Sequence, residues 1–181
     1  MRASLPLLLL LGCMPDDWDG TPYDPSEWQT AGEVAGGAGA VDDTGAPVSA
    51  AAIAGTWVST GDDLSELFAG TPFEYDTITA EFGVGGAYTV TPVDGAGATY
   101  PLLGTYVVDI TTDPARITLF QDSPYAAEAE GIWSLSGDVL SYEVVQTVPD
   151  YGFTPPSPES GFGSTSGSGL TPGANVQVYR R

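Results

Sequence analysis

Carboxylates and hydroxyls are the chemically active groups of this chain. Its 181 residues include 24 Asp and Glu, 4 Arg and Lys and no His. A protein without His or Lys lacks the base of a Ser-His pair, the amine of a Schiff base and the imidazole ligand of zinc. Acid–base catalysis then depends on neighbouring acids, such as Asp62 with Asp63 or Glu128 with Glu130. Such acids are usually solvated charge, so the sequence predicts no enzyme, metal or cofactor.

The charge of the chain restricts its partners. The formal net charge is −20, and the only basic residues after Arg2 are Arg116, Arg180 and Arg181. Binding to nucleic acid needs cations opposite the phosphates, so nucleic acid is excluded as a partner. An anionic membrane surface repels such a domain. Dispersed acids indicate solubility rather than an acidic recognition surface.

The single thiol, Cys13, lies where an apolar run meets an acidic one. Arg2 begins the chain's basic n-region, Leu5 to Leu11 are apolar apart from Pro6, and Gly12 is a small residue. This order is that of a secretory signal, and the run is shorter than the roughly 20 residues that span a bilayer. An ordinary signal peptide with an incidental thiol is the alternative.

The stretch Leu10-Leu11-Gly12-Cys13 resembles the lipobox of bacterial lipoproteins. The resemblance implies a signal peptide over residues 1–12, cleavage before Cys13, a diacylglycerol on its sulfur and an acyl group such as palmitate on the new amino terminus. Two or more acyl chains hold a protein stably on a membrane. Because Met14 rather than Asp follows the cysteine, the resemblance further implies the outer membrane of the cell envelope.

Residues 13–52 read as an acidic tether. The stretch 31–47 is rich in Ala and Gly and has no periodicity, which is typical of a flexible linker. A random coil of this length spans about 35 Å. The more aromatic stretch 16–28 is interpreted as a disordered docking segment. A calcium loop through Asp17, Asp19 and Asp24 is the alternative, but it lacks the spacing of known loops.

The domain from residue 53 to 181 shows the period-two alternation of β-strands. In 75–82, for example, Ile78, Ala80 and Phe82 alternate with Thr and Glu. Short Gly- or Pro-containing turns separate the segments, which predicts antiparallel neighbours. Residues 61–70 predict one helical turn, and 149–173 a mobile loop. Eight strands are expected, over 53–59, 75–82, 87–93, 100–110, 116–120, 130–136, 139–148 and 175–180.

Eight antiparallel strands joined in order favour an up-and-down barrel, and a two-sheet sandwich is the alternative. The segments GTW (55–57), GTYVVD (104–109) and GIWSLSGDVLSYEV (131–144) resemble bacterial lipocalin-like domains. In lipocalins a Gly-x-Trp closes one barrel end and an Arg after the last strand packs over the Trp. The resemblance therefore implies that Gly55, Trp57 and either Arg180 or Arg181 close this barrel, through a cation–π contact.

Two functions follow from these expectations. The lipocalin resemblance implies a small apolar or amphipathic ligand in the open barrel end. The alternative is that the inward aromatics only fill the core, and that the chain is an accessory envelope protein. It would then bind a protein partner through the tether and through Tyr151, Phe153 and Phe162. The predicted ligand-lining residues are Phe82, Tyr88, Tyr106, Leu119, Trp133 and Tyr142.

Overall fold

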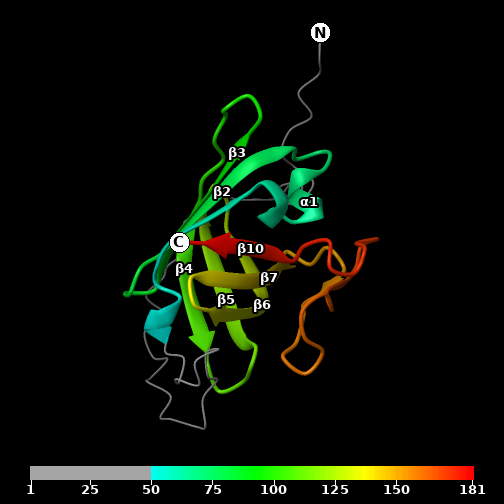
Figure 1. Cartoon of the computed structure of the whole chain (residues 1–181). Coiled ribbons are helices and arrows are strands. Elements are labelled where there is room, and N and C mark those ends of the chain that lie inside the picture. The colour runs from blue at the N-terminus through cyan, green and yellow to red at the C-terminus, as the bar shows by residue number, and fades with distance from the viewer. Residues whose placement is uncertain (1–49) are drawn as a thin grey trace.

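The computed structural model describes residues 50–181, and these residues form a closed antiparallel barrel (Figure 1). The strands follow the order β1-β10-β7-β6-β5-β4-β3-β2, so each barrel strand pairs with the next one along the chain and β1 closes on β10. The predicted eight-stranded up-and-down barrel is confirmed, and the sandwich is excluded. The strands are β1 (Gly55–Thr60), β2 (Tyr75–Phe82), β3 (Ala87–Asp94), β4 (Leu102–Asp109), β5 (Ala115–Ser123), β6 (Ala127–Ser136), β7 (Val139–Val148) and β10 (Gln177–Arg180).

Alternation along each strand separates the barrel interior from its outer surface. In β2 the side chains of Ile78, Ala80 and Phe82 are buried, whereas Glu81 between them is exposed. This is the pattern expected when successive side chains point to opposite faces of a sheet. Burying one face of every strand produces a single core inside the barrel.

Close strand packing explains one of the Gly-x-aromatic motifs. A Cβ atom on Gly131 of β6 would lie 2.0 Å from the carbonyl oxygen of Glu143 on the neighbouring strand β7. Only glycine allows the two backbones this approach. The aromatic residue of the same motif, Trp133, is fully buried. The glycine therefore sets the distance between two strands, and the indole two residues later fills the core.

The connection between β1 and β2 holds two short helical turns, η3 (Gly61–Asp63) and α1 (Glu66–Ala69). A further turn, η2 (Ala50–Ala52), precedes the barrel. Ser65 is the N-cap of α1, and its hydroxyl accepts a hydrogen bond from the Phe68 N–H. The helical turn predicted within 61–70 is confirmed.

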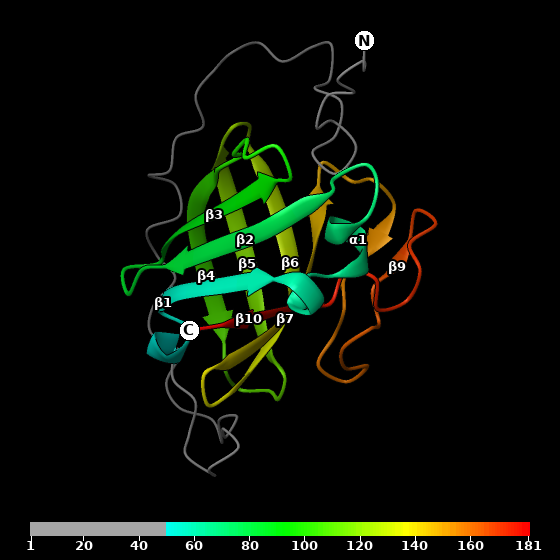
Figure 2. The same ribbon diagram turned by 45° about the horizontal axis from the view of Figure 1, so that its top comes forward.

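A long connection, residues 149–176, joins β7 to β10 and is called the strap below. It contains a two-stranded sheet of β8 (Phe153–Thr154) and β9 (Ser166–Gly167), which the sequence did not predict. In both ribbon views the strap and α1 lie at one end of the barrel, and the last residue, Arg181, lies at the opposite end (Figures 1 and 2). The two ends are called the strap end and the Trp57 end.

Candidate ligand-binding cavity

A cavity of about 190 Å³ occupies the strap end of the barrel. Residues from β2 to β7 and from β10 form its walls, and residues from α1 and the strap complete it. Its lining is mainly aliphatic and aromatic, with a few amide and hydroxyl groups and the carboxylate of Glu128. Small-molecule sites generally combine an apolar wall with a few polar groups in this way.

Three of the predicted lining residues reach this cavity. Tyr88 of β3, Leu119 of β5 and Tyr142 of β7 all contribute to its wall. Leu119 and Tyr142 lie near the middle of their strands, whereas Tyr88 is the second residue of β3.

The other three predicted lining residues do not reach the cavity but pack nearer the Trp57 end. The rings of Phe82 and Tyr106 meet edge to face, with centroids 5.1 Å apart. Trp133 is fully buried in the same core. The sequence showed that these side chains point inward. It did not show how far along the barrel axis each one lies, and that position decides between packing and lining.

Trp57, which the lipocalin resemblance predicts to close one end of the barrel, is buried beneath an arginine. Its indole is fully buried, and the Nε1–H donates to the Ile53 carbonyl oxygen at 2.7 Å. The Cζ atom of Arg181 lies 4.4 Å from the centroid of the Trp57 rings, within the range of a cation–π contact. Gly55 has a φ of 131°, and a Cβ there would be 3.8 Å from the Arg181 guanidinium.

Arg181, not Arg180, is therefore the arginine over Trp57. Arg180 lies on the outer face of β10 and forms a two-pronged ion pair with Asp63, at 2.7 Å and 3.0 Å. Strand alternation explains the difference, because Tyr179 points into the barrel and its neighbour must point out. Arg180 lowers the pKa of Asp63 through this hydrogen-bonded contact.

Aromatic side chains form the mouth of the cavity at the strap end. Phe68 from α1 meets Phe73 edge to face at 5.9 Å, and the rings of Phe73 and Tyr75 are 5.6 Å apart. Tyr75 also contacts Tyr100, whose hydroxyl donates to Asp94 at 2.9 Å. Burial, with smaller contributions from Tyr100 and Asp94, raises the pKa of Tyr75 to about 12.

Hydrogen bonds fix α1 in this position. The side-chain carbonyl of Gln177, on β10, accepts from the backbone N–H of Ser65 at 2.9 Å. The Gln177 amide nitrogen in turn donates to the hydroxyl of Ser59 on β1. The backbone N–H of Leu67 donates to the Ala174 carbonyl of the strap at 2.9 Å. The mouth is thus a built feature, held to two strands and to the strap.

Besides Tyr75 and Tyr100 at its mouth, three tyrosine hydroxyls belong to the cavity wall. They come from Tyr88, Tyr142 and Tyr179, on β3, β7 and β10. Within residues 50–181 none of them makes a hydrogen bond. Burial raises the pKa of each phenol, and for Tyr142 the nearby phenols of Tyr179 and Tyr88 add to the effect. All three groups therefore stay protonated at neutral pH and remain available as donors.

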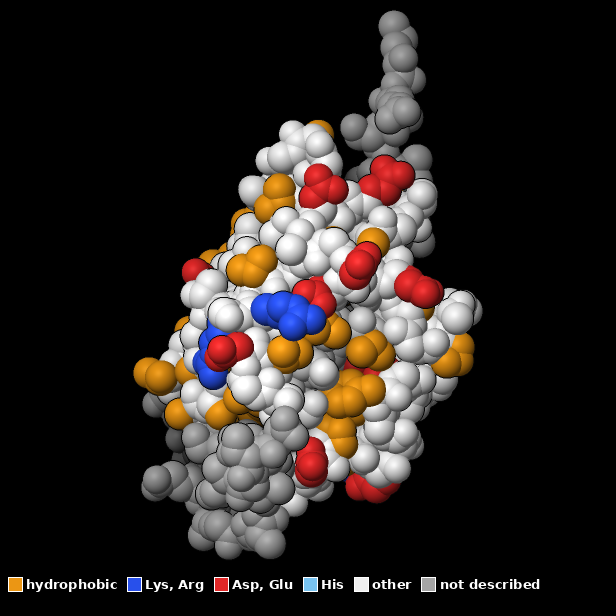
Figure 3. Space-filling model, viewed as in Figure 1, with side chains coloured by type: hydrophobic (Ala, Val, Ile, Leu, Met, Phe, Trp, Pro, Cys, Tyr) orange, Lys and Arg blue, Asp and Glu red, His pale blue; other side chains and the backbone are white. Residues whose placement is uncertain are grey.

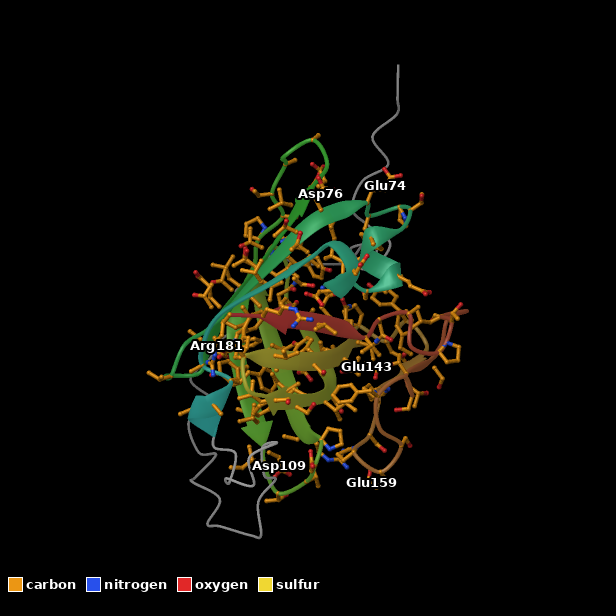
Figure 4. All side chains as sticks on the ribbon, viewed as in Figure 1. Glu74, Asp76, Asp109, Glu143, Glu159 and Arg181 are labelled. Atoms are coloured by element: carbon orange, nitrogen blue, oxygen red, sulfur yellow. The ribbon has the colours of Figure 1, made fainter. Side chains whose placement is uncertain are left out.

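A buried carboxylate attaches the strap to the barrel. Glu143 of β7 is fully buried, and its oxygens accept from Gly163 N at 2.6 Å, Thr165 N at 2.9 Å and Thr165 Oγ1 at 2.5 Å. The Thr165 hydroxyl also accepts from Asn175 Nδ2 at 3.1 Å, and Asn175 lines the cavity. Figure 4 shows Glu143 where β7 faces the strap. The chain of contacts therefore runs from the barrel wall through the strap to the cavity.

The strap aromatics are less exposed than a docking surface requires. Tyr151, Phe153 and Phe162 are all only partly exposed, and Phe153 lines the cavity. The strap also contacts β5, through the ion pair between Glu159 of the strap and Arg116 of that strand, at 3.3 Å. The strap is part of the barrel wall in this structure.

The predicted acid pairs have other surroundings. Asp62 is exposed, and Asp63 is the partner of Arg180. Glu128 and Glu130 lie two residues apart on β6, and of these only Glu128 borders the cavity. Among residues 50–181, no group of three His, Cys, Asp or Glu side chains is placed to hold a metal ion. The tether segment 16–28, for which a calcium loop was the alternative, and the predicted lipidation site Cys13 lie outside the described residues.

Acidic side chains are spread singly over the face of the molecule shown in Figure 3, and the arginines there lie beside acids. This distribution is typical of a solvated surface rather than of one recognition patch. No helix within the described part of the chain has the length and apolarity needed to cross a membrane.

The barrel and its cavity define a class of fold, an eight-stranded antiparallel barrel with a cavity toward one end. Comparisons with protein-family models, with curated proteins and with solved structures returned no match for this chain.

Proposed function

We propose that this chain is a non-enzymatic, lipocalin-like binding module that holds a small apolar or amphipathic ligand in the strap end of its barrel. The observation that carries the proposal is the cavity itself. It combines an apolar wall with three tyrosine hydroxyls that have no partner in residues 50–181. A barrel that only packed its core would have no reason to keep buried donors beside open space, because unpaired polar groups destabilise a fold.

The proposed site of action is the bacterial outer membrane, reached through acyl groups on Cys13. The lipobox-like residues before Cys13 support the anchor, and the net charge of −20 supports the need for one. The tether then separates the barrel from the lipid headgroups. The same charge argues against nucleic acid as a partner.

The ligand proposal is tested by native mass spectrometry of the chain purified from its own host, compared with the same sample after denaturation. We expect a bound molecule of small mass that is lost on unfolding. A bare mass in the native spectrum, together with no binding of any small apolar probe, would refute a ligand-binding role. The accessory role with a protein partner would then be the better explanation.

The anchor is tested separately, by the substitution Cys13→Ala. We expect the variant to stay unprocessed and unacylated, and its barrel to lose the attachment that depends on the lipid. Fractionation and metabolic labelling with radioactive palmitate measure both effects. If the variant remained labelled, the lipobox interpretation would be wrong, whatever the result for the ligand.

A further inference from the structure

We infer that the cavity takes an uncharged molecule of about one aromatic ring in size, whose inner end carries a carbonyl or hydroxyl oxygen bound by Tyr88, Tyr142 and Tyr179. This inference rests on the ligand-binding function proposed above and specifies the chemistry of the ligand. Size, hydrogen bonding and charge each contribute one part of it.

The volume of the cavity limits the size of the ligand. An apolar cavity of about 150 Å³ accommodates benzene. The cavity here measures about 190 Å³, which leaves room for a ring with a short substituent. A much longer molecule, such as a long acyl chain, would have to extend out of the cavity through its mouth. The aromatic mouth of Phe68, Phe73, Tyr75 and Tyr100 is suited to the flat face of a ring.

The tyrosine hydroxyls specify an oxygen at the inner end of the ligand. The rings of Tyr142 and Tyr179 meet edge to face at 6.0 Å, and Tyr88 reaches the same cavity from β3. Each hydroxyl can donate one hydrogen bond, and none does so to another group in residues 50–181. A carbonyl or hydroxyl oxygen accepts such bonds, whereas a hydrocarbon leaves the donors unsatisfied.

The distribution of charge excludes an anionic ligand. The three arginines of residues 50–181 are all engaged away from the cavity: Arg116 with Glu159, Arg180 with Asp63, and Arg181 with Asp138 and Trp57. A buried carboxylate on the ligand would therefore have no cation as a partner, and Glu128 at the cavity would repel it.

A buried cation is disfavoured at the inner end for a related reason. The groups there are phenols, and a cation taken out of water needs a carboxylate close to it. Glu128 lies near the start of β6, at the strap end of that strand, and Asp122, the other acid whose charge acts on Tyr88, is an exposed residue of β5. With anions and cations both disfavoured, a neutral molecule is the class of ligand that fits the cavity.

A matched series of probes tests the inference on the full chain by calorimetry. The probes are acetophenone, 1-phenylethanol, ethylbenzene, benzoate and benzylammonium, which share one ring and differ in the polar group. We expect acetophenone and 1-phenylethanol to bind about tenfold more tightly than ethylbenzene. Benzoate and benzylammonium should bind more weakly than ethylbenzene.

Two substitutions connect the preference to the named hydroxyls. Tyr142→Phe and Tyr179→Phe each remove one oxygen and keep the ring, so we expect acetophenone affinity to fall about three- to tenfold while ethylbenzene affinity is unchanged. Tyr106→Phe is the matched control. Its hydroxyl donates to the Gly83 carbonyl at 2.9 Å, outside the cavity, and its loss should leave both affinities unchanged. Circular dichroism checks that each variant is folded.

The outcomes separate the inference from the function on which it rests. If ethylbenzene bound as tightly as acetophenone, or if both cavity variants bound acetophenone like the parent, the hydroxyl assignment would be overturned and the binding function would stand. Tightest binding by benzoate or benzylammonium would overturn the choice of a neutral ligand. If no probe bound at all, the inference would fail, and the native mass spectrum would decide whether the proposed binding function stands.

Discussion

Glu143→Ala removes the carboxylate to which the strap donates three hydrogen bonds. The substitution leaves two backbone N–H groups and the Thr165 hydroxyl without their acceptor. A donor that loses its buried partner destabilises a fold by about 1–3 kcal/mol. Water can reach part of a freed strap, so we take the lower value for each donor and expect a loss of about 3 kcal/mol in the free energy of unfolding.

Glu143→Gln provides a graded comparison. The glutamine oxygen can still accept from both Thr165 donors, but its NH₂ group replaces the oxygen that accepts from Gly163 N. One donor is then unpaired, so we expect a loss of about 1 kcal/mol. Glu130→Gln is the control, because Glu130 is exposed on the adjacent strand and its substitution should change stability by less than about 0.5 kcal/mol.

Urea unfolding measures these free energies, and amide hydrogen exchange locates the effect. We expect the amides of Gly163 and Thr165 to exchange slowly in the parent and quickly in Glu143→Ala. The reasoning would be refuted by an alanine variant as stable as the Glu130→Gln control, or by unchanged exchange at these two amides.

Three further predictions test other parts of the barrel. Gly131→Ala forces a methyl group against the Glu143 carbonyl and should destabilise the barrel by about 1–3 kcal/mol, measured by urea unfolding. Arg181→Ala uncovers the buried indole at the closed end and should raise the accessibility of its fluorescence to acrylamide, whereas Arg180→Ala should not. The ion pair with Arg180 lowers the pKa of Asp63, so its stabilisation is complete above the unfolded pKa of about 3.9 and is lost as pH falls through the lower folded value. We therefore expect Asp63→Asn to lower the melting temperature at pH 7 and to match the parent near pH 2.

The strands were predictable because their signal is local. Alternation in a segment such as 75–82 depends only on residues within that segment, and the observed strand β2 covers the same range. Closure of the barrel was predictable from the number of strands and the short turns between them. The closing tryptophan was also predictable, since Trp57 carries a recognisable motif.

The features that were missed depend on contacts between distant residues. Glu143 looks like an ordinary outward-facing acid, and its burial is caused by backbone N–H groups about 20 residues later, which no side-chain pattern shows. The choice between Arg180 and Arg181 depends on the register of β10. The cavity members Tyr179 and Gln177 were missed because the last strand is short and follows the strap. The alternating apolar residues of 175–180 are Val176 and Val178, which are only partly buried, whereas their neighbours Gln177 and Tyr179 are the buried ones.

The seam between β1 and β10 has a consequence for how the barrel opens. The two strands pair at Val58 and Arg180. A side-chain hydrogen bond from the Gln177 amide to the Ser59 hydroxyl, between residues 118 apart in the sequence, reinforces this pairing. Bringing such distant segments together carries a large loss of chain entropy, so we expect this seam to form late and to separate early. Separation exposes two unpaired strand edges. Two opened molecules can pair these edges with each other, and exchange of β10 is then the route by which this barrel would form domain-swapped dimers.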